Sequence, residues 1–198
     1  MVRQKIIARH WWPDGASLDL YDNFEASRDA ILSFSGSNSA QEFEKYFFDT
    51  QDLFSCFEIP VMQNPKPSLS DMNWAVLSKP RILTKIHPHR SLSSSLKYKF
   101  SDYRLQQLFA RYATYVGGSP LESPALLSLI WQAEARGVWS IKGGMNKLAS
   151  VLEKLALDRG TSFTYDSEVK ELNTDGDKLV SITDNLGNKH RADKFIFN

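Results

Sequence analysis

Two Gly-Gly pairs lie within one aromatic-rich stretch and constrain the path of the chain more than any other feature. The stretch is RYATYVGGSPLESPALLSLIWQAEARGVWSIKGGMNKL, residues 111–148, with the pairs at Gly117–Gly118 and Gly143–Gly144. Glycine has no Cβ, so its backbone can turn sharply or come close to a flat ligand. We therefore expect a tight corner at each pair, and each corner is also a candidate surface for a ligand.

The middle of the chain has the spacing and capping signals of helices. Asp22 with Glu25 predicts one helix start, and Ser39 with Glu42 predicts a second. A stripe of side chains after the second start recurs at helical spacing, and we interpret it as core packing. Its members are Phe43, Phe47, Thr50, Phe54 and Phe57.

Further helices are predicted toward the Gly-Gly pairs. One runs from Ser68 to Ser78, and residues 79–91 form an irregular basic connection. Residues 91–116 return to helix, and Ser123–Pro124 starts another helix that continues to residue 136. The inward face of the region 91–116 consists of Leu105, Leu108, Phe109 and Tyr112.

The two ends of the chain have the patterns of strands. Residues 5–22 predict a hairpin that turns at Pro13–Asp14–Gly15. Residues 137–141 form a short strand before the second Gly-Gly pair, and residues 161–198 form strands with turns at Asp175–Gly176 and Leu186–Gly187. The helix between them has an inner stripe made of Met145, Leu148, Leu152 and Leu155.

This order of elements predicts an α+β fold in which helices rest on an antiparallel sheet. The chain enters a strand almost at once and stops within the apolar segment Phe195–Ile196–Phe197. An unpaired apolar strand invites aggregation, so natural domains seldom end in one. We therefore expect the chain to be a segment of a larger protein.

Composition excludes several functional classes. The chain carries 24 basic and 23 acidic side chains, a net charge of +1, so no basic surface favours nucleic acid as a partner. Cys56 is the only cysteine, so an intrachain disulfide cannot form and a cysteine-based zinc site is disfavoured. No apolar run has the length of a signal peptide core or of a membrane span. A reducing, cytoplasmic location is the default expectation.

His87–Pro88–His89 is the one local arrangement that suggests a metal. Two histidines at i and i+2 on an extended backbone point the same way, but a catalytic zinc needs a third protein ligand. We interpret the pair as solvated histidines in a basic loop and keep a zinc hydrolase that uses His87 and His89 as an alternative. No nucleophile elbow, phosphate-binding loop or dinucleotide fingerprint is present.

Five segments closely resemble the FAD-dependent carotenoid desaturases of the phytoene dehydrogenase-like family. They are LFARYATYVGGSP, SPALLSLIWQAE and GVWSIKGGMNKLA in the middle, RHWWPDGASLDLY near the start and HRADKFIFN at the end. Within that family the chain looks most like the hydroxyneurosporene, or 1-hydroxycarotenoid 3,4-, desaturases. The likeness runs from about Ala8 to Asn198.

The resemblance implies a flavoprotein that removes a hydride from a C–H bond beside a polyene. In such enzymes the FAD-binding fingerprint precedes the part present here, so the chain would be a central segment that is inactive alone. It implies a substrate-binding domain at residues 1–160, and at residues 161–198 strands that lead back to the FAD domain. Peripheral membrane contact, through an apolar helix in the 39–80 region, would admit the carotenoid.

The same resemblance suggests site residues. Aromatic side chains and glycines near the corners would line a dry substrate tunnel. They are Tyr112, Tyr115, Gly117, Gly118, Trp131 and Trp139. Gly143 and Gly144 match the family's turn beside the flavin, and Val169, in SEVKEL, matches a position near the adenine. No catalytic acid or base is assigned. The rival hypothesis is a non-enzymatic module that binds an apolar ligand or a protein.

Overall fold

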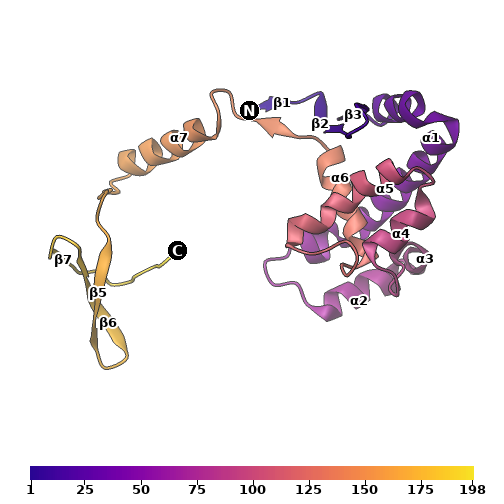
Figure 1. The fold of residues 1–198 in the computed structure, drawn as a ribbon. Coiled ribbons are helices and arrows are strands. Elements are labelled where there is room, and N and C mark those ends of the chain that lie inside the picture. The colour runs from indigo at the N-terminus through magenta and orange to yellow at the C-terminus, as the bar shows by residue number, and fades with distance from the viewer. The chain divides into compact units, whose positions relative to one another are not determined.

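A computed structural model describes all 198 residues, which form two compact units, residues 1–142 and residues 143–198 (Figure 1). The mixture of helices with small antiparallel sheets agrees with the predicted α+β class. The first unit ends at Lys142, before the helix that the sequence assigned to the domain 1–160. The reason is that no residue of this helix, α7 (Met145–Asp158), is buried. The assignment of residues 1–160 and 161–198 to enzyme domains stays a prediction.

The first unit begins with the predicted hairpin. Strand β2 (Ile6–Trp11) pairs antiparallel with β3 (Ser17–Tyr21). At the turn, Asp14 Oδ1 accepts a hydrogen bond of 3.0 Å from the backbone N–H of Ala16, and Gly15 has φ 83°. A second ribbon joins β1 (Val2–Arg3) to β4 (Trp139–Ser140), so the two ends of this unit are hydrogen-bonded to each other.

Helix α1 (Phe24–Phe57) is the longest element, and its path corrects two expectations. Its N-cap is Asn23, whose side chain accepts from the backbone N–H of Ala26, rather than Asp22. The expected new start at Ser39 is also wrong, because the backbone leaves helical geometry earlier, at Gly36 (φ 87°, ψ 177°). Only glycine adopts this conformation without strain.

The remaining helices of the first unit are short. They are α2 (Leu69–Ser78), α3 (Leu83–Ile86), α4 (Leu92–Lys99), α5 (Tyr103–Ala110) and α6 (Ile130–Ala135). A π-helical turn, Glu58–Met62, follows α1, and 3-10 segments cover Pro80–Ile82, Arg111–Val116 and Ala125–Leu129. The predicted helix over residues 68–78 is confirmed as α2, and the structure adds a reciprocal cap formed by Ser68 and Asp71 at its start. The long helix expected over residues 124–136 is 3-10 in its first half.

The core of this unit is an aromatic cluster at the centre of the helices. The stripe on α1 contributes Phe43, which is fully buried and stacks near Phe109 of α5 at a ring-centroid distance of 6.1 Å. Trp131 of α6 meets Phe109 edge-on at 5.4 Å. The interpretation of the stripe as core is confirmed, since Thr50, Phe54 and Phe57 are buried and Phe47 is partly buried.

The second unit consists of α7 followed by a three-stranded antiparallel sheet, β5 (Val169–Asp175), β6 (Lys178–Asp184) and β7 (Lys189–His190). Both predicted turns lie between these strands. The expected inner stripe of α7 is wrong for this structure, because Met145 and Leu152 are 69% and 56% exposed. The predicted last strand does not form, since residues 195–197 pair with no other segment. No helix of either unit has the length and apolar character to cross a membrane.

Candidate functional site

The first Gly-Gly pair makes the predicted corner, and its two glycines are needed for different reasons. The 3-10 segment Arg111–Val116 ends at Gly117, which takes the left-handed conformation with φ 67°. Gly118 is needed for space, because a Cβ there would lie 2.4 Å from Ser123 Oγ. The backbone N–H of Gly118 donates to Ala113 O at 3.0 Å. The chain therefore turns back on itself at this point.

Three of the predicted aromatic residues lie together beside the corner. The ring of Tyr112 lies 5.7 Å from that of Tyr115 and 6.4 Å from that of Trp131, measured between centroids. Tyr112 and Trp131 are fully buried, whereas Tyr115 is 57% exposed. Trp139 lies on β4, half exposed, where Arg3 covers its ring at 5.7 Å. Only Tyr115 and Trp139 of these four present a surface to a ligand.

Glu134 of α6 collects hydrogen bonds from these tyrosines. Its Oε2 accepts a bond of 2.8 Å from the Tyr112 hydroxyl, and its Oε1 accepts one from the Tyr115 hydroxyl. The guanidinium of Arg111 pairs with the same carboxylate and also donates to the Tyr112 hydroxyl at 2.9 Å. We call Arg111, Tyr112, Tyr115 and Glu134 the carboxylate network.

The carboxylate network holds the charges of Arg111 and Glu134 in partly buried positions. Burial, with the Glu134 charge, raises the pKa of Tyr112 far above its usual value, although Arg111 opposes the shift. Burial alone would lower the pKa of Arg111, but Tyr112 and Glu134 outweigh it and raise that pKa. Tyr112 therefore stays a protonated donor and Arg111 stays charged. The sequence did not single out Arg111 and Glu134; their opposite charges within residues 111–148 were the only available signal.

A pocket of about 290 Å³ lies beside the network, since Arg111 belongs to both. Its other lining residues are Arg9, His10, Trp11, Trp12, Gln107 and Leu108. Arg111 Nε and His10 Nδ1 are buried and have no hydrogen-bond partner in the protein. Burial first, and then the Arg111 charge, lowers the pKa of His10. The sequence offered no reason to select His10, because the contact depends on the hairpin packing against α5.

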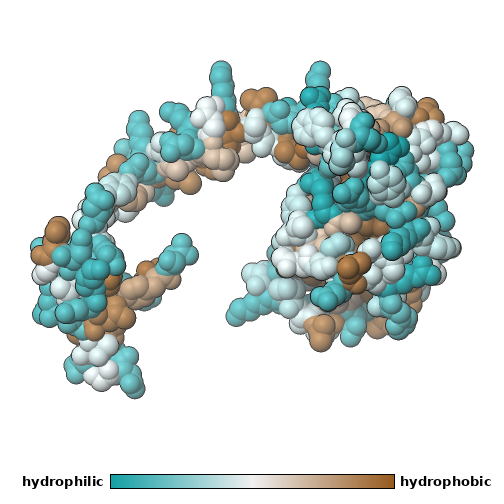
Figure 2. Space-filling view, viewed as in Figure 1, coloured by the Kyte–Doolittle hydropathy of each residue, from teal (hydrophilic) through white to brown (hydrophobic).

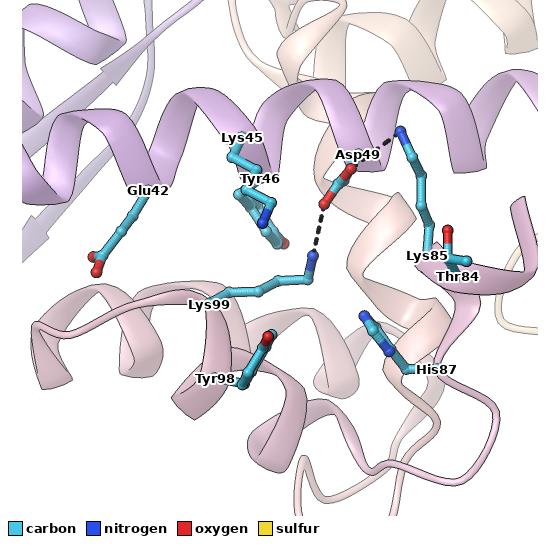
Figure 3. A pocket seen from close by; sticks show the side chains of 9 residues that line it. All are labelled: Glu42, Lys45, Tyr46, Asp49, Thr84, Lys85, His87, Tyr98 and Lys99. Carbon is cyan, nitrogen blue, oxygen red and sulfur yellow. Dashed lines mark hydrogen bonds and ion pairs between the residues drawn. The ribbon is translucent and has the colours of Figure 1, made fainter. Parts of the chain in front are cut away.

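A cavity of about 560 Å³, lined mainly by charged and polar residues, lies between α1, α3 and α4 (Figure 3). Figure 3 shows Asp49 between two lysines, with its carboxylate oxygens 3.1 Å from Lys85 Nζ and 3.0 Å from Lys99 Nζ. His87 faces this cavity, whereas His89 is exposed and does not line it. Charged walls suit a polyene poorly. No group of three histidine, cysteine or carboxylate side chains could hold a metal ion.

The predicted cofactor residues lie in the second unit. Gly143 and Gly144 both have left-handed backbones, with φ 91° and 84°, and Gly144 is the N-cap of α7. A Cβ on Gly144 would meet nothing within 4 Å, so the turn leaves room for a flat group. Val169 begins β5 and is 40% exposed. The open space at Gly144 fits the close approach of a flat ring, but Gly143, Gly144 and Val169 do not form a nucleotide cradle by themselves.

Comparison with known proteins identifies several relatives of this sequence. No family model matches it. It is 39% identical to a hydroxyneurosporene desaturase of Cereibacter sphaeroides over 198 residues, which are the whole chain and 40% of that protein. It is 38% identical to the hydroxyneurosporene desaturase of Rhodobacter capsulatus over 192 residues, 97% of the chain and 39% of the relative.

A more distant relative is the 1-hydroxycarotenoid 3,4-desaturase of a Flavobacterium species. The two are 28% identical over 214 residues, which cover the whole chain and 40% of the relative. The chain therefore spans about two fifths of the length of the curated relatives that it matches. Because the similarity to these desaturases extends over all of its length, the chain belongs to the carotenoid desaturase family.

Proposed function

We propose that the protein to which this chain belongs is an FAD-dependent carotenoid desaturase, and that residues 1–142 supply much of its substrate-binding surface. The observation that carries the proposal is the whole-length similarity to the hydroxyneurosporene desaturases. Bound flavin supplies the hydride acceptor for forming a new double bond. We expect the 198-residue chain alone to be inactive, because it holds no nucleotide cradle.

The chain's own contribution is to position an oily substrate and to exclude water. The exposed rings of Tyr115 and Trp139 offer flat apolar surfaces to a polyene, and Gly117–Gly118 removes side chains from the neighbouring corner. Tyr112 and Trp131 have almost no exposed surface. We assign them to the wall behind Tyr115, where they hold its ring in place. Gly143 and Gly144 remain the proposed contacts beside the flavin ring, and Val169 remains the proposed contact near the adenine of FAD.

A carotenoid is dissolved in lipid, so the substrate surface needs access to a membrane. Exposed apolar side chains gather on the π-helical turn, α2 and α3, where Figure 2 shows apolar residues at the surface of this unit. They are Ile59, Met62, Leu69, Trp74, Leu77 and Leu83. Lys66, Lys79 and Arg81, all exposed, lie in the same segment. We propose that this apolar surface is the peripheral membrane contact.

The test uses the complete coding sequence that contains this chain. The purified protein is expected to carry flavin, seen in its absorbance spectrum, and to convert a hydroxylated carotenoid in lipid vesicles. The product has one more conjugated double bond, so its absorption moves to longer wavelength. A protein that binds no flavin and converts no carotenoid contradicts the proposal. Polyene binding without flavin or turnover would instead favour a non-enzymatic apolar-ligand module.

A further inference from the structure

A basic pocket lies in the segment that carries the exposed apolar side chains of α2 and α3. It has a volume of about 380 Å³ and is lined by side chains from α1, the 3-10 segment Pro80–Ile82 and α3. Its basic residues are Lys79, Arg81 and Lys85, and Pro80 and Ile82 supply its apolar wall. The pocket therefore joins cations to an apolar wall within the proposed membrane contact.

The charges of this pocket do not balance. Asp52 is the one acidic residue of the lining, and its Oδ2 lies 2.5 Å from Lys85 Nζ. Lys85 also pairs with Asp49 at 3.1 Å, so carboxylates of α1 already compensate its charge. The side chains of Lys79 and Arg81 carry hydrogen-bond donors and no acceptor. They leave the pocket positively charged, and it therefore favours an anion that accepts hydrogen bonds.

A tight turn brings these two cations to one pocket. Helix α2 ends at Ser78, and Lys79, its C-cap, has the extended backbone that a following proline favours (φ −136°, ψ 71°). Pro80 then begins a 3-10 turn, in which the backbone N–H of Ile82 donates to Lys79 O at 2.8 Å. The side chains of Lys79 and Arg81 consequently line the same pocket.

The neighbours of the two cations in the chain indicate what kind of anion fits. Leu77 and Leu83 stand on either side of them and are 73% and 54% exposed. At a membrane interface, apolar side chains enter the acyl boundary while basic side chains meet the anionic headgroups. A free phosphate would satisfy Lys79 and Arg81 but would leave both leucines in water. The combination therefore favours a lipid over a soluble anion.

We infer that this pocket binds the phosphate of an anionic phospholipid headgroup, with Arg81 and Lys79 as donors and with Leu77 and Leu83 entering the acyl boundary beside it. A guanidinium pairs with phosphate through two parallel hydrogen bonds, and an ammonium acts as a point charge. The inference rests on the proposed function, in which this face meets lipid, and adds the lipid class that the face selects. Headgroup binding also orients the protein with α2 and α3 toward the bilayer.

The test measures sedimentation of the complete protein with two kinds of vesicle. One consists of phosphatidylcholine alone, and the other is an equimolar mixture of phosphatidylcholine and phosphatidylglycerol. A basic side chain near an anionic membrane surface strengthens binding about fivefold. We expect the wild-type protein to bind the anionic vesicles about 20- to 30-fold more tightly than the neutral ones, because Lys79 and Arg81 both contribute.

Arg81→Gln removes one charge together with the paired donors. It should lower the affinity for anionic vesicles by about fivefold or more and leave the affinity for neutral vesicles unchanged. Lys66→Gln is the matched control, because it removes the same charge from an exposed position of the same segment that does not line the pocket. Its effect should be clearly smaller. Inorganic phosphate alone, titrated calorimetrically, should show no saturable binding.

Three results would overturn the inference. Equal affinity of the wild-type protein for both kinds of vesicle would leave the pocket to an acidic segment of a protein partner. Equal losses in Arg81→Gln and Lys66→Gln would show a diffuse attraction without a headgroup site. Saturable phosphate binding that Arg81→Gln abolishes would assign the pocket to a soluble anion. The proposed function fails separately, if the complete protein holds no flavin and converts no carotenoid in detergent micelles.

Discussion

The hydroxyl of Tyr112 donates a hydrogen bond of 2.8 Å to Oε2 of Glu134, which lies 22 residues further along the chain. The bond joins the 3-10 segment before the first Gly-Gly corner to helix α6 after it. Arg111 pairs with the same carboxylate, so the loop between the two segments is closed at its base by a charged contact. The exposed ring of Tyr115 is positioned by this closure.

Glu134→Gln should therefore loosen the corner. The change removes the charge that faces Arg111 and leaves a half-buried guanidinium without its counter-ion. Because the Arg111 side chain is 31% exposed, we expect a loss of only about 1–2 kcal/mol in the free energy of unfolding. Urea denaturation of the chain measures it. Glu122→Gln, at an exposed position of the same loop, is the control, and equal stability of the two variants would contradict the role given to Glu134.

Gly118 is predicted to be required for space alone. Gly118→Ala places a Cβ 2.4 Å from Ser123 Oγ and should destabilise the chain by about 1–3 kcal/mol. Ser123→Ala removes the opposing oxygen, so the double variant should recover much of the loss. A double-mutant cycle from thermal or urea unfolding gives the coupling energy. Strictly additive effects of the two substitutions would show that the contact is not the cause.

Acid should weaken the attachment of α5. The hydrogen bond from the Arg104 guanidinium is the main reason that the pKa of Asp102 lies at about 2. Burial of Asp102 opposes this effect, because burial raises the pKa of a carboxyl group. A carboxylate whose pKa is lowered in the folded state stabilises the fold at pH values above its ordinary pKa of 3.8. This stabilisation is lost as the pH falls through the folded-state pKa. We expect part of the stability to be lost between about pH 4 and pH 2.

Asp102→Asn tests this dependence, because asparagine can still cap α5 but does not titrate. Its free energy of unfolding should change less than that of the wild-type chain across the same acidic window. Asp175→Asn, at the exposed end of β5, is the control. Parallel pH profiles for wild type and Asp102→Asn would refute the assignment.

Cys56 is expected to be unreactive in the folded chain. Its Sγ lies within a buried cluster and donates to Ala75 O at 3.4 Å, and burial raises the pKa of the thiol. Thiolate is the reacting species, so a thiol reagent at neutral pH should label the native chain very slowly. In urea the reagent should titrate one thiol per chain. Rapid labelling without denaturant would show that α1 and α2 separate readily.

The apolar surface on α2 should carry the affinity for lipid. Trp74 and Leu77 are each 73% exposed, so the double change Trp74→Ser with Leu77→Ser should leave the fold intact. We expect it to reduce sedimentation of the complete protein with vesicles of mixed neutral and anionic lipid by about tenfold, since each side chain contributes burial of apolar area. Tyr103→Ser, also exposed but on α5, is the control. Unchanged sedimentation would place the membrane contact elsewhere.

Local chemistry was sufficient to predict several elements. The hairpin turn follows from Pro13–Asp14–Gly15, and the helix over residues 68–78 was predicted from the sequence as well. These features depend on contacts between residues a few positions apart, which the order of the sequence contains directly. The aromatic stripe on α1 was predicted as core for the same reason, since helical spacing alone defines one face.

Other features depend on residues that meet only after folding. Gly36, not the capping signal at Ser39, ends the first part of α1, and Ser39 is instead buried beside Ser35. The apolar stripe of α7 predicts an inner face, yet the stripe is exposed because no part of its unit covers it. Periodicity defines a face of a helix but does not specify what packs on that face.

The candidate site shows the same division. The glycine pairs, and the two tyrosines just before the first pair, were visible in the amino-acid order, because backbone freedom and aromatic character belong to single residues. The meeting of Arg111, Tyr112 and Tyr115 at Glu134, and of His10 and Arg111 in one pocket, depended on how α6 and the hairpin pack against α5 and the following 3-10 segment. Contacts between residues distant in the chain are set by the packing of whole elements, and no local pattern encodes them.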